Sequence, residues 1–337
     1  MNVTYFTRKP SAIHFSIETL FKNIIDHLPK DVTPTITEAS YVNSGWKNKL
    51  YNMFEILLKE QGDVNHITGD DYYKALFMNK SKTVITFHDL NLLYTPNKLK
   101  RFIQAWFWLR MPILRSKFVT VVSETTKKEV IKYAKCPPQK IRVIHNCISP
   151  AFQPHPKTFN KSYPTILHIG SKPNKNLKGL INAIQDLDCR LEIVGKPTEQ
   201  EIALLERYKI DYHIQFGLTE KQMVNKYVEC DILSFVSLYE GFGLPIVEAN
   251  MVERVVITSN TSCMPEVAKD AACFVNPHDV TSINQGIKKV IEDDDYRQSL
   301  IENGKKNRER FLPTIIADRY FQLYREMIYQ EQYQLQA

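Results

Sequence analysis

Thr165-Ile-Leu-His-Ile-Gly170 is a short β-branched run that ends in glycine, and similar runs recur along the second half of the chain. Amphipathic stretches separate these runs, which comprise residues 191–195, 213–217, 231–236, 255–258 and 272–275. Alternation of short apolar runs with amphipathic stretches predicts βαβ units and a parallel sheet. The second half is therefore predicted to be a doubly wound α/β domain.

The first half repeats this alternation less regularly. Its predicted strands cover 3–6, 64–67, 84–87 and 119–122, and its predicted helices cover 16–27 and 125–135. A chain of 337 residues exceeds the size at which single cores stop growing, so two domains are expected. The proline-rich stretch Pro150-Ala-Phe-Gln-Pro-His-Pro156 suits a linker. We predict Rossmann-like domains over 1–155 and 156–314, with a helix over 315–331 packing back on the first.

Composition narrows the class of protein. Hydrophobic residues make up 43% and charged residues 24%, as in soluble globular proteins, and no apolar run approaches the roughly 20 residues that span a bilayer. The first ten residues have no apolar export signal, which predicts a cytoplasmic location. The cysteines are scattered singly without metal-ligand spacing, so we expect reduced structural thiols (Cys136, Cys147, Cys189, Cys230, Cys263, Cys273).

The most informative segment is Ser237-Leu-Tyr-Glu-Gly-Phe-Gly-Leu-Pro-Ile-Val-Glu-Ala249, which follows a predicted strand. Two glycines flank Phe242, and Pro245 suits the first position of a helix. Bare backbone amides at a helix amino terminus hold a diphosphate well, because the N–H groups and the helix dipole both favour negative charge. Glu240 and Glu248 lie at the same edge, where carboxylates are suited to binding sugar and ribose hydroxyls rather than phosphate.

A diphosphate beside two carboxylates needs a cation. The loop Gly170-Ser-Lys-Pro-Asn-Lys-Asn-Leu177 supplies Lys172 and Lys175 after the first strand of the same predicted domain. Ligands of open α/β sheets bind at the carboxyl ends of the strands, so we expect this loop and the Glu240 loop to meet at one edge.

In combination these segments resemble the retaining glycosyltransferases of sequence family four, which have the GT-B fold. Glu240 and Glu248 match the E-x7-E motif of that family, and residues 170–177 resemble its phosphate loop. Weaker matches follow the family order along the chain: Phe87-His-Asp-Leu90, Val122-Ser-Glu-Thr-Thr126, His145-Asn146 and Cys263-Met-Pro-Glu266. The resemblance implies two Rossmann-like domains that face each other across a cleft.

The resemblance also implies roles for single residues. Glu248 would bind the donor ribose, Glu240 the donor sugar and Lys175 the diphosphate, while His88 would contact the sugar from the other domain. The wider implied donor-binding set is Gly170, Ser171, Lys172, Gly241, Phe242, Gly243 and Leu244. The implied reaction is transfer of a hexose-type sugar from a nucleoside diphosphate to a glycan or lipid-linked acceptor. It would proceed with retention and need neither a metal nor a cofactor besides the donor.

Two departures from the family keep other functions open. The phosphate loop is one residue short and has Asn174 where the family has arginine, and Arg8-Lys-Pro-Ser-Ala-Ile-His14 replaces the amino-terminal glycine-rich loop. A catalytically weak relative that binds a nucleotide sugar or a partner enzyme is one alternative. A nucleotide-sugar epimerase of the same architecture is another. His88 also suits a hydrogen-bonded core histidine.

Charge is distributed unevenly along the chain. Residues 1–155 hold 22 Lys and Arg against 12 Asp and Glu, and residues 98–117 hold six of these cations, no acid and several aromatic residues. One interpretation is an interfacial helix on the inner, anionic face of a membrane. The other is a surface helix whose stripe of Phe102, Trp106, Leu109 and Ile113 packs on the sheet. No motif supports nucleic-acid binding, and the acidic run 293–295 suits a solvated turn better than a metal site.

Overall fold

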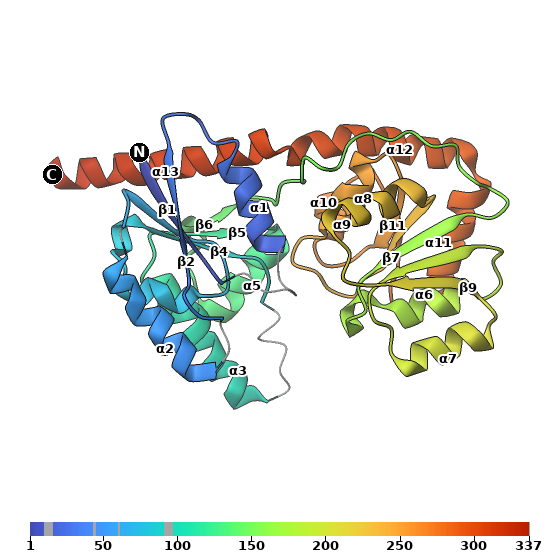
Figure 1. Cartoon of the computed structure of the whole chain (residues 1–337), viewed down its shortest axis with the longest axis horizontal. Coiled ribbons are helices and arrows are strands. Elements are labelled where there is room, and N and C mark those ends of the chain that lie inside the picture. Colours follow the sequence, from blue (N-terminus) through green and yellow to red (C-terminus); the bar gives the residue numbers. More distant parts are fainter. Residues whose placement is uncertain (10–15, 43–44, 60, 91–96, 337) are drawn as a thin grey trace. The chain divides into compact units, whose positions relative to one another are not determined.

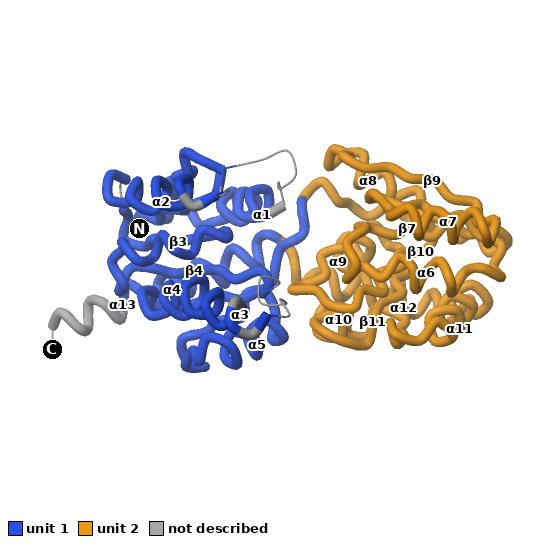
Figure 2. The backbone as a smooth tube through the Cα atoms, turned by 90° about the horizontal axis from the view of Figure 1, so that it is seen from below, with its two compact units in different colours: residues 1–149, 313–337 blue, residues 150–312 orange. Residues whose placement is uncertain are grey.

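Two parallel six-stranded sheets, each flanked by helices, organise the chain in the computed structural model (Figure 1). The structure describes residues 1–9, 16–42, 45–59, 61–90 and 97–336. Residues 1–149 and 313–337 form unit 1, and residues 150–312 form unit 2 (Figure 2). Residues 10–14 of the segment that replaces the glycine-rich loop lie outside the described residues.

The sheet of unit 2 has the strand order β12-β11-β10-β7-β8-β9, and all its neighbouring strands are parallel. Along the chain, β7 is followed by β8 and β9 on one side of it, and the chain then crosses over to β10, β11 and β12 on the other side. The bounds are β7 (Thr165–Ile169), β8 (Arg190–Val194), β9 (Asp211–Gln215), β10 (Ile232–Phe235), β11 (Val255–Ser259) and β12 (Cys273–Val275).

Helices cover both faces of this sheet. One face packs against α6 (Leu177–Ala183), α7 (Glu199–Arg207) and α11 (Val280–Glu292), and α8 (Glu220–Glu229) and α9 (Leu244–Met251) lie on the other (Figure 1). The unit is completed by α10 (Met264–Ala268) and α12 (Asp294–Arg308). Thr219 is the N-cap of α8, and its hydroxyl accepts from the amide of Gln222 in a capping box.

The sheet of unit 1 has the order β2-β1-β3-β4-β5-β6 and is also parallel throughout. Its strands are β1 (Asn2–Thr7), β2 (Thr33–Glu38), β3 (Val64–Ile67), β4 (Thr83–Phe87), β5 (Phe118–Val121) and β6 (Ile141–Val143). Sequence patterning missed β2, an edge strand with Pro34 and largely exposed side chains, and β6, which is only three residues long.

Two helical layers sandwich the sheet of unit 1. Helices α1 (Ser16–Ile25) and α13 (Pro313–Gln336) pack on one face. The other face is covered by α5 (Glu124–Ala134) and by the continuous segment α3 (Lys98–Gln104), η5 (Ala105–Arg110) and α4 (Met111–Leu114). On the same face, beside this segment, lies α2 (Gly45–Glu55). Short 3-10 helices over 56–58 (η1) and 72–77 (η2) lie next to it and pack in the same core.

The prediction that four side chains of the helix over 98–117 pack on the sheet is correct for two of them and wrong for the other two. Leu109 and Ile113 are buried, but the side chains of Phe102 and Trp106 are 64% and 36% exposed. The reason is that Trp106 and Leu109 lie in the π-helix η5, whose wider turn does not keep side chains of α-helical spacing on one face. Among the described residues, no helix has the length and hydrophobicity needed to cross a membrane.

The proline-rich stretch 150–156 falls within unit 2, where the ring of Phe152 packs on that of Tyr227 with centroids 5.4 Å apart. All six cysteines are buried and free, as expected of structural thiols.

A buried hydrogen-bond chain joins α13 to the sheet of unit 1. His66 Nδ1 lies 2.7 Å from the hydroxyl of Tyr324, and its Nε2 lies 2.7 Å from the hydroxyl of Thr86. Burial lowers the pKa of His66 to about 3, so the ring is neutral at pH 7 and pairs one donor and one acceptor nitrogen with these hydroxyls.

Tyr324→Phe should therefore lower the free energy of unfolding by about 1–3 kcal/mol, because it leaves a buried imidazole nitrogen without a partner. Denaturant titration followed by circular dichroism would measure the loss. Tyr329→Phe is the matched control on the same helix. Because Tyr329 is exposed, loss of its hydroxyl should change the free energy of unfolding by less than about 0.5 kcal/mol. Equal effects of the two substitutions would contradict the role of the buried chain.

Candidate functional site

The predicted site residues of unit 2 gather where the strand order reverses. Strands β7 and β10 are neighbours in the sheet although β8 and β9 come between them in the sequence. The loop 170–176 leaves the carboxyl end of β7, and the loop 236–243 leaves the carboxyl end of β10. The amide of Leu238 donates to the carbonyl of Asn174 at 2.8 Å, so the two loops are in direct contact. This crevice is where open α/β sheets bind ligands.

An ion pair between Lys175 and Glu240 lies at the centre of this site. Lys175 Nζ donates to Glu240 Oε1 at 2.7 Å, and both side chains are mostly shielded from solvent. The ammonium group also lies 4.9 Å from the ring centroid of Phe235, which stabilises the cation further. A cation and a hydroxyl-binding carboxylate are thus placed side by side.

Gly170 makes room for the stem of Lys175. Its φ of +94° is a conformation that side chains disfavour, and a Cβ there would lie 2.8 Å from Lys175 Cγ. The carbonyl of Gly170 accepts a hydrogen bond from buried His168 Nε2 at 2.9 Å. The loop therefore begins from a fixed backbone position.

Two asparagines tie the loops together. Asn174 Nδ2 donates to the carbonyl of Tyr239 at 3.0 Å and to Glu240 Oε1 at 3.3 Å. Asn176 Nδ2 donates to the carbonyls of Val236 at 3.1 Å and Pro277 at 2.7 Å. Asn174, which stands where the resembled family has arginine, is thus used to position Glu240 and adds no positive charge.

Residues of the loop after β11 hold the backbone of Glu240. Ser262 Oγ accepts from the Glu240 amide at 3.2 Å and donates to the Glu240 carbonyl at 2.9 Å. The thiol of Cys263 donates to the carbonyls of Glu240 at 3.2 Å and Phe242 at 3.0 Å. Three loops therefore converge on one carboxylate, which fixes its direction.

The amino terminus of α9 completes the site. Gly243 is its N-cap, with φ +92°, and no side chain of the described residues caps the helix. The first-turn amides of Gly243 and Leu244 thus lie beside the half-buried Gly241, where they suit an anion. The ring of Phe242 packs edge-on against Phe311, so this residue can offer a ligand only its backbone.

Glu248 lies on α9 and is half-buried. One carboxylate oxygen, Oε2, accepts a short hydrogen bond from the hydroxyl of the fully buried Tyr227. Within the described part of the chain Oε1 has no hydrogen-bond partner. Burial raises the pKa of Glu248 to about 7, and the Tyr227 hydrogen bond and the nearby charge of Lys175 limit that rise. The carboxylate is thus oriented by one oxygen and can accept hydroxyl donors at the other.

The remaining predicted residues of the β7 loop lie at its rim. The side chain of Lys172 is exposed and makes no hydrogen bond or ion pair with any residue that the structure describes, and only its backbone carbonyl accepts, from the amide of Lys175 at 2.8 Å. Ser171 Oγ accepts from the amide of Lys196 at 2.9 Å, which links the loop to the one after β8. Of the two predicted cations, only Lys175 contacts a carboxylate of the site, that of Glu240.

His88 belongs to unit 1, where it follows the carboxyl end of β4. Its Nε2 donates to the carbonyl of Thr68 at 2.8 Å, so this nitrogen carries the proton. Burial lowers the pKa of His88, which favours a neutral ring with a lone pair on Nδ1. Such a ring can accept a hydrogen bond from a hydroxyl, and it also fits the alternative of a bonded core histidine.

The acidic run 293–295 serves α12. Asp293 caps the helix by accepting from the amide of Tyr296 at 2.8 Å, and Asp294 pairs with Arg297 at 2.6 Å. No cluster of three or more His, Cys, Asp or Glu side chains suited to a metal occurs among the residues that the structure describes.

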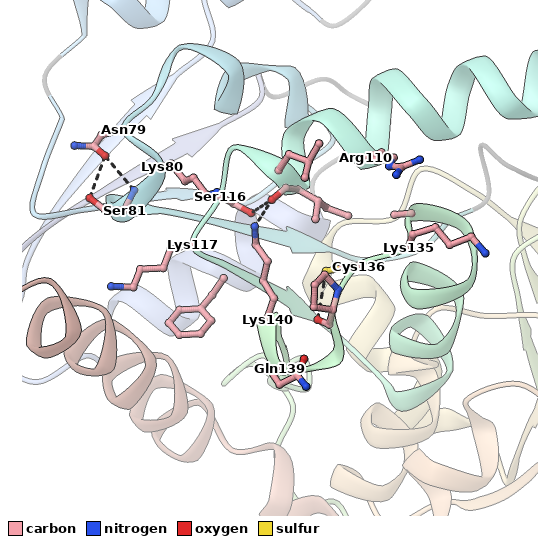
Figure 3. Close-up of a pocket in the computed structure, with 15 residues that line it drawn as sticks. Asn79, Lys80, Ser81, Arg110, Ser116, Lys117, Lys135, Cys136, Gln139 and Lys140 are labelled. Carbon is pink, nitrogen blue, oxygen red and sulfur yellow. Dashed lines mark hydrogen bonds between the residues drawn. The ribbon is translucent and has the colours of Figure 1, made fainter. Parts of the chain in front are cut away.

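A cavity of about 880 Å³ lies away from these residues, in unit 1 (Figure 3). It opens at the amino-terminal ends of β4, β5 and β6, the opposite edge from that used by ligands of parallel sheets. Five cations and no acidic residue of the described chain line it: Lys80, Arg110, Lys117, Lys135 and Lys140. Burial lowers the pKa of Lys140 to about 8.

Sequence reasoning missed several residues that orient the predicted ones. Tyr227, the hydrogen-bond partner of Glu248, was not predicted as a site residue. Ser262 carried no signal because it acts through backbone groups of a distant segment. The only sequence hint was that Asn174 and Asn176 flank Lys175, since asparagine often bonds to backbone groups in turns.

Two family models match the chain with little overlap. Residues 151–307 match the model described as "Glycosyl transferases group 1", and residues 7–152 match "Glycosyltransferase Family 4". The first match covers both loops of the site in unit 2, and the second covers His88.

Relatives and solved structures agree with these models. The chain is 26% identical to O-antigen chain mannosyltransferase B of Escherichia coli over 68% of its own length and 66% of that protein. It is 27% identical to O-antigen chain mannosyltransferase RfbU of Salmonella typhimurium over 61% of its length and 60% of that protein. The chain thus spans about two thirds or less of these relatives.

The fold resembles Anabaena Alr3699/HepE in complex with UDP and glucose, with a TM-score of 0.78 at 12% identity, covering 96% of this chain and 99% of that one. A glycosyltransferase from Rickettsia africae gives a TM-score of 0.74 at 18% identity, with coverage of 97% and 99%. These similarities show the two-domain α/β fold of the GT-B type.

The raised pKa of Glu248 predicts a pH-dependent cost in stability. Between pH 4.5 and about 7 the folded chain keeps a proton that the unfolded chain releases, so the free energy of unfolding falls as pH rises through this range. Glu248→Gln has no proton to release and keeps an acceptor for Tyr227. At pH 8 the variant should be more stable than the wild type by on the order of 1–3 kcal/mol, and near pH 4 the gain should vanish.

Thermal unfolding at a series of pH values would measure this difference. Glu206→Gln, at an exposed position of α7, is the matched control and should follow the wild-type profile. If the stability of Glu248→Gln and of the wild type changed in parallel with pH, burial would not raise the pKa of Glu248.

Proposed function

We propose that this chain, which belongs to the group 1 glycosyltransferase family, transfers a hexose-type sugar from a nucleoside diphosphate to a glycan or lipid-linked acceptor. The observation that carries the proposal is the pairing of Lys175 with Glu240 beside the uncapped amino terminus of α9, with Glu248 on the same helix. These groups lie at the strand-order reversal of unit 2, where a nucleotide fits the fold.

Each group suits one part of the donor. The diphosphate oxygens would bind to the ammonium of Lys175 and to the amides of Gly243 and Leu244, because these are the positive groups of the site. Withdrawal of Lys175 toward phosphate would leave Glu240 to accept hydrogen bonds from sugar hydroxyls. The ribose hydroxyls would donate to Glu248 Oε1, while Tyr227 holds the other oxygen. His88 Nδ1 is proposed as an acceptor for a further sugar hydroxyl.

The proposed chemistry is loss of the nucleoside diphosphate through an oxocarbenium-like state. Negative charge that develops on the leaving phosphate is stabilised by Lys175 and by the α9 amides, which are already aimed at it. The site residues include no nucleophile placed for a covalent intermediate. We therefore favour attack by the acceptor hydroxyl on the face from which the diphosphate leaves, which gives retention.

The comparisons favour mannose as the first sugar to test, since the curated relatives above are named mannosyltransferases. A structural neighbour in complex with UDP and glucose makes UDP-glucose the second donor to test. The O-antigen names of the relatives favour a surface polysaccharide or lipid-linked glycan as acceptor.

A second candidate is a catalytically weak relative that binds a nucleotide sugar for a partner enzyme. Asn174 supports it, because a neutral amide stands at the position of a second cation and is occupied by Tyr239 and Glu240. A single ammonium group compensates less of the diphosphate charge than two cations would.

Incubation of the full chain with GDP-mannose, UDP-glucose and UDP-N-acetylglucosamine, each with a lipid-linked glycan acceptor, separates these functions. Release of the nucleotide that depends on acceptor supports transfer. Saturable binding without release supports the second candidate, and absence of both would reject the site.

Glu248→Ala should weaken donor binding by about 1.5–3 kcal/mol, the range for hydrogen bonds to a charged group. Calorimetric titration at pH 8, where the carboxyl is mostly ionised, would measure the loss. Glu206→Ala is the control with an equal change of charge at an exposed position. Unchanged affinity of Glu248→Ala would remove this residue from the donor site.

Activity should also survive removal of divalent cations, because the proposed compensation of the diphosphate comes from Lys175 and backbone amides. Transfer rates measured before and after dialysis against EDTA should agree within about twofold, far below the effect of losing a catalytic Lewis acid. Complete loss that magnesium or manganese restores would overturn the side-chain account.

A further inference from the structure

The outer layer of unit 1 exposes an unusual number of large apolar side chains. On α2 and η1 the exposed side chains are Leu50, Tyr51, Phe54, Leu57 and Leu58. On α3, η5 and α4 they are Leu99, Phe102, Ile103, Trp106, Phe107 and Leu114. The exposed fraction reaches 89% at Leu58 in the first group and 68% at Leu99 in the second. Clustered exposure of this kind marks an interaction surface rather than ordinary solvated surface.

Both helical segments belong to one continuous layer. Lys49 on α2 lies 4.2 Å above the ring of Trp108 on η5, and Trp108 packs edge-on against Tyr73 of the intervening η2. The core sides of the two segments are filled by Ile56 and by Leu109. The exposed apolar residues therefore lie on the side turned away from the sheet. We call this layer, residues 45–59 and 97–114, the outer face.

The outer face and its immediate flank are strongly cationic. Residues 45–59 and 98–117 together contain nine Lys and Arg and one acidic residue, although the whole chain has a net charge of only +7. The one acid, Glu55, is paired with Lys59 at 3.1 Å and with the hydroxyl of Ser40 at 2.5 Å. The rest of the chain is thus close to neutral, and the positive charge of the protein is concentrated beside its exposed apolar side chains.

The cationic surface continues past the end of α4 into the cavity of unit 1. Arg110, Ile113 and Leu114 belong to the helical segment and also line that cavity (Figure 3). Lys117 and Lys140 there donate to backbone carbonyls of Met327 and Ile113. Apolar groups next to cations fit an amphiphile with an anionic head.

We propose that unit 1 docks on an anionic phospholipid bilayer through the outer face. Exposed aromatic and aliphatic side chains such as Phe102 and Phe107 enter the boundary between headgroups and acyl chains. Arg101, Arg110 and the cavity cations pair with lipid phosphates. A bilayer matches both features at once, because it presents an apolar layer beneath a negatively charged surface. This proposal rests on the outer face and not on the proposed function.

Flotation of the full chain with vesicles tests the proposal without any sugar donor. Vesicles of phosphatidylcholine with roughly 30 mol% phosphatidylglycerol should bind the wild type at about 0.05 M salt and bind it much less at about 0.5 M, because screening shortens the reach of the charges. Vesicles of phosphatidylcholine alone should bind it at least roughly tenfold more weakly at low salt. Absence of binding to anionic vesicles at low salt would overturn the proposal.

Two paired variants identify the surface. Arg101→Glu with Arg110→Glu should reduce partitioning by roughly tenfold or more at low salt. Phe102→Ser with Phe107→Ser should reduce it by a similar factor and leave the ratio between low and high salt unchanged.

Matched controls are taken from exposed positions of unit 2. Lys209→Glu with Lys221→Glu controls for net charge, and Phe216→Ser controls for loss of an exposed aromatic ring. These variants should bind vesicles within about twofold of the wild type, since they lie outside the cationic and apolar surface. Unchanged circular dichroism spectra would exclude unfolding of any variant.

A protein partner or a second copy of the chain is the competing occupant. Sedimentation velocity would reveal self-association that Phe102→Ser with Phe107→Ser abolishes. That result combined with no vesicle binding would assign the outer face to a dimer and reject the bilayer. Loss of vesicle binding in the unit 2 controls would equally reject it, because binding would then follow net charge alone.

Discussion

The contact between Lys175 and Glu240 is the constraint on which the site of unit 2 depends. A free ammonium or a free carboxylate at a crevice sheltered from solvent would raise the free energy of the folded chain, and each side chain relieves the other. Their contact requires the loops after β7 and β10 to meet. Asn174, Asn176 and Ser262 all serve that meeting by bonding to backbone groups of neighbouring loops.

The second acidic residue of the site shows the opposite balance. Glu248 is only partly compensated, and its pKa of about 7 means that folding leaves a proton bound near neutral pH. The hydroxyl of Tyr227 stabilises the carboxylate by a hydrogen bond to Oε2, and Phe152 of the proline-rich stretch packs on the ring of the same tyrosine. The chain thereby retains a destabilising carboxyl in a fixed orientation, which is the expected state of a group whose hydrogen-bond partner arrives with a ligand.

Unit 1 separates its polar and apolar groups in an unusual way. Its interior contains a fully satisfied histidine, His66, which links α13 to the sheet through Tyr324. Its outer layer leaves aromatic rings such as Phe102 and Phe107 exposed between cations. Buried polar groups of the interior such as His66 are thus hydrogen-bonded, as in other folded cores, while the surface has the composition of an interfacial helix. The π-helical turn of η5 produces this arrangement by shifting Phe102 and Trp106 away from Leu109.

The sequence by itself determined the α/β class and the second sheet, because strand period, glycine position and helix start are local properties of the chain. It also predicted Lys175, Glu240 and Glu248 as site residues, because their residue types suit a charged ligand at strand ends. Only the tertiary structure decided that Asn174 positions Glu240, and that Tyr227 orients Glu248, since those contacts join segments more than twenty residues apart. Side-chain burial on the helix over 98–117 was also decided there, because a π-helix has no recognisable residue pattern and changes which side chains face the sheet.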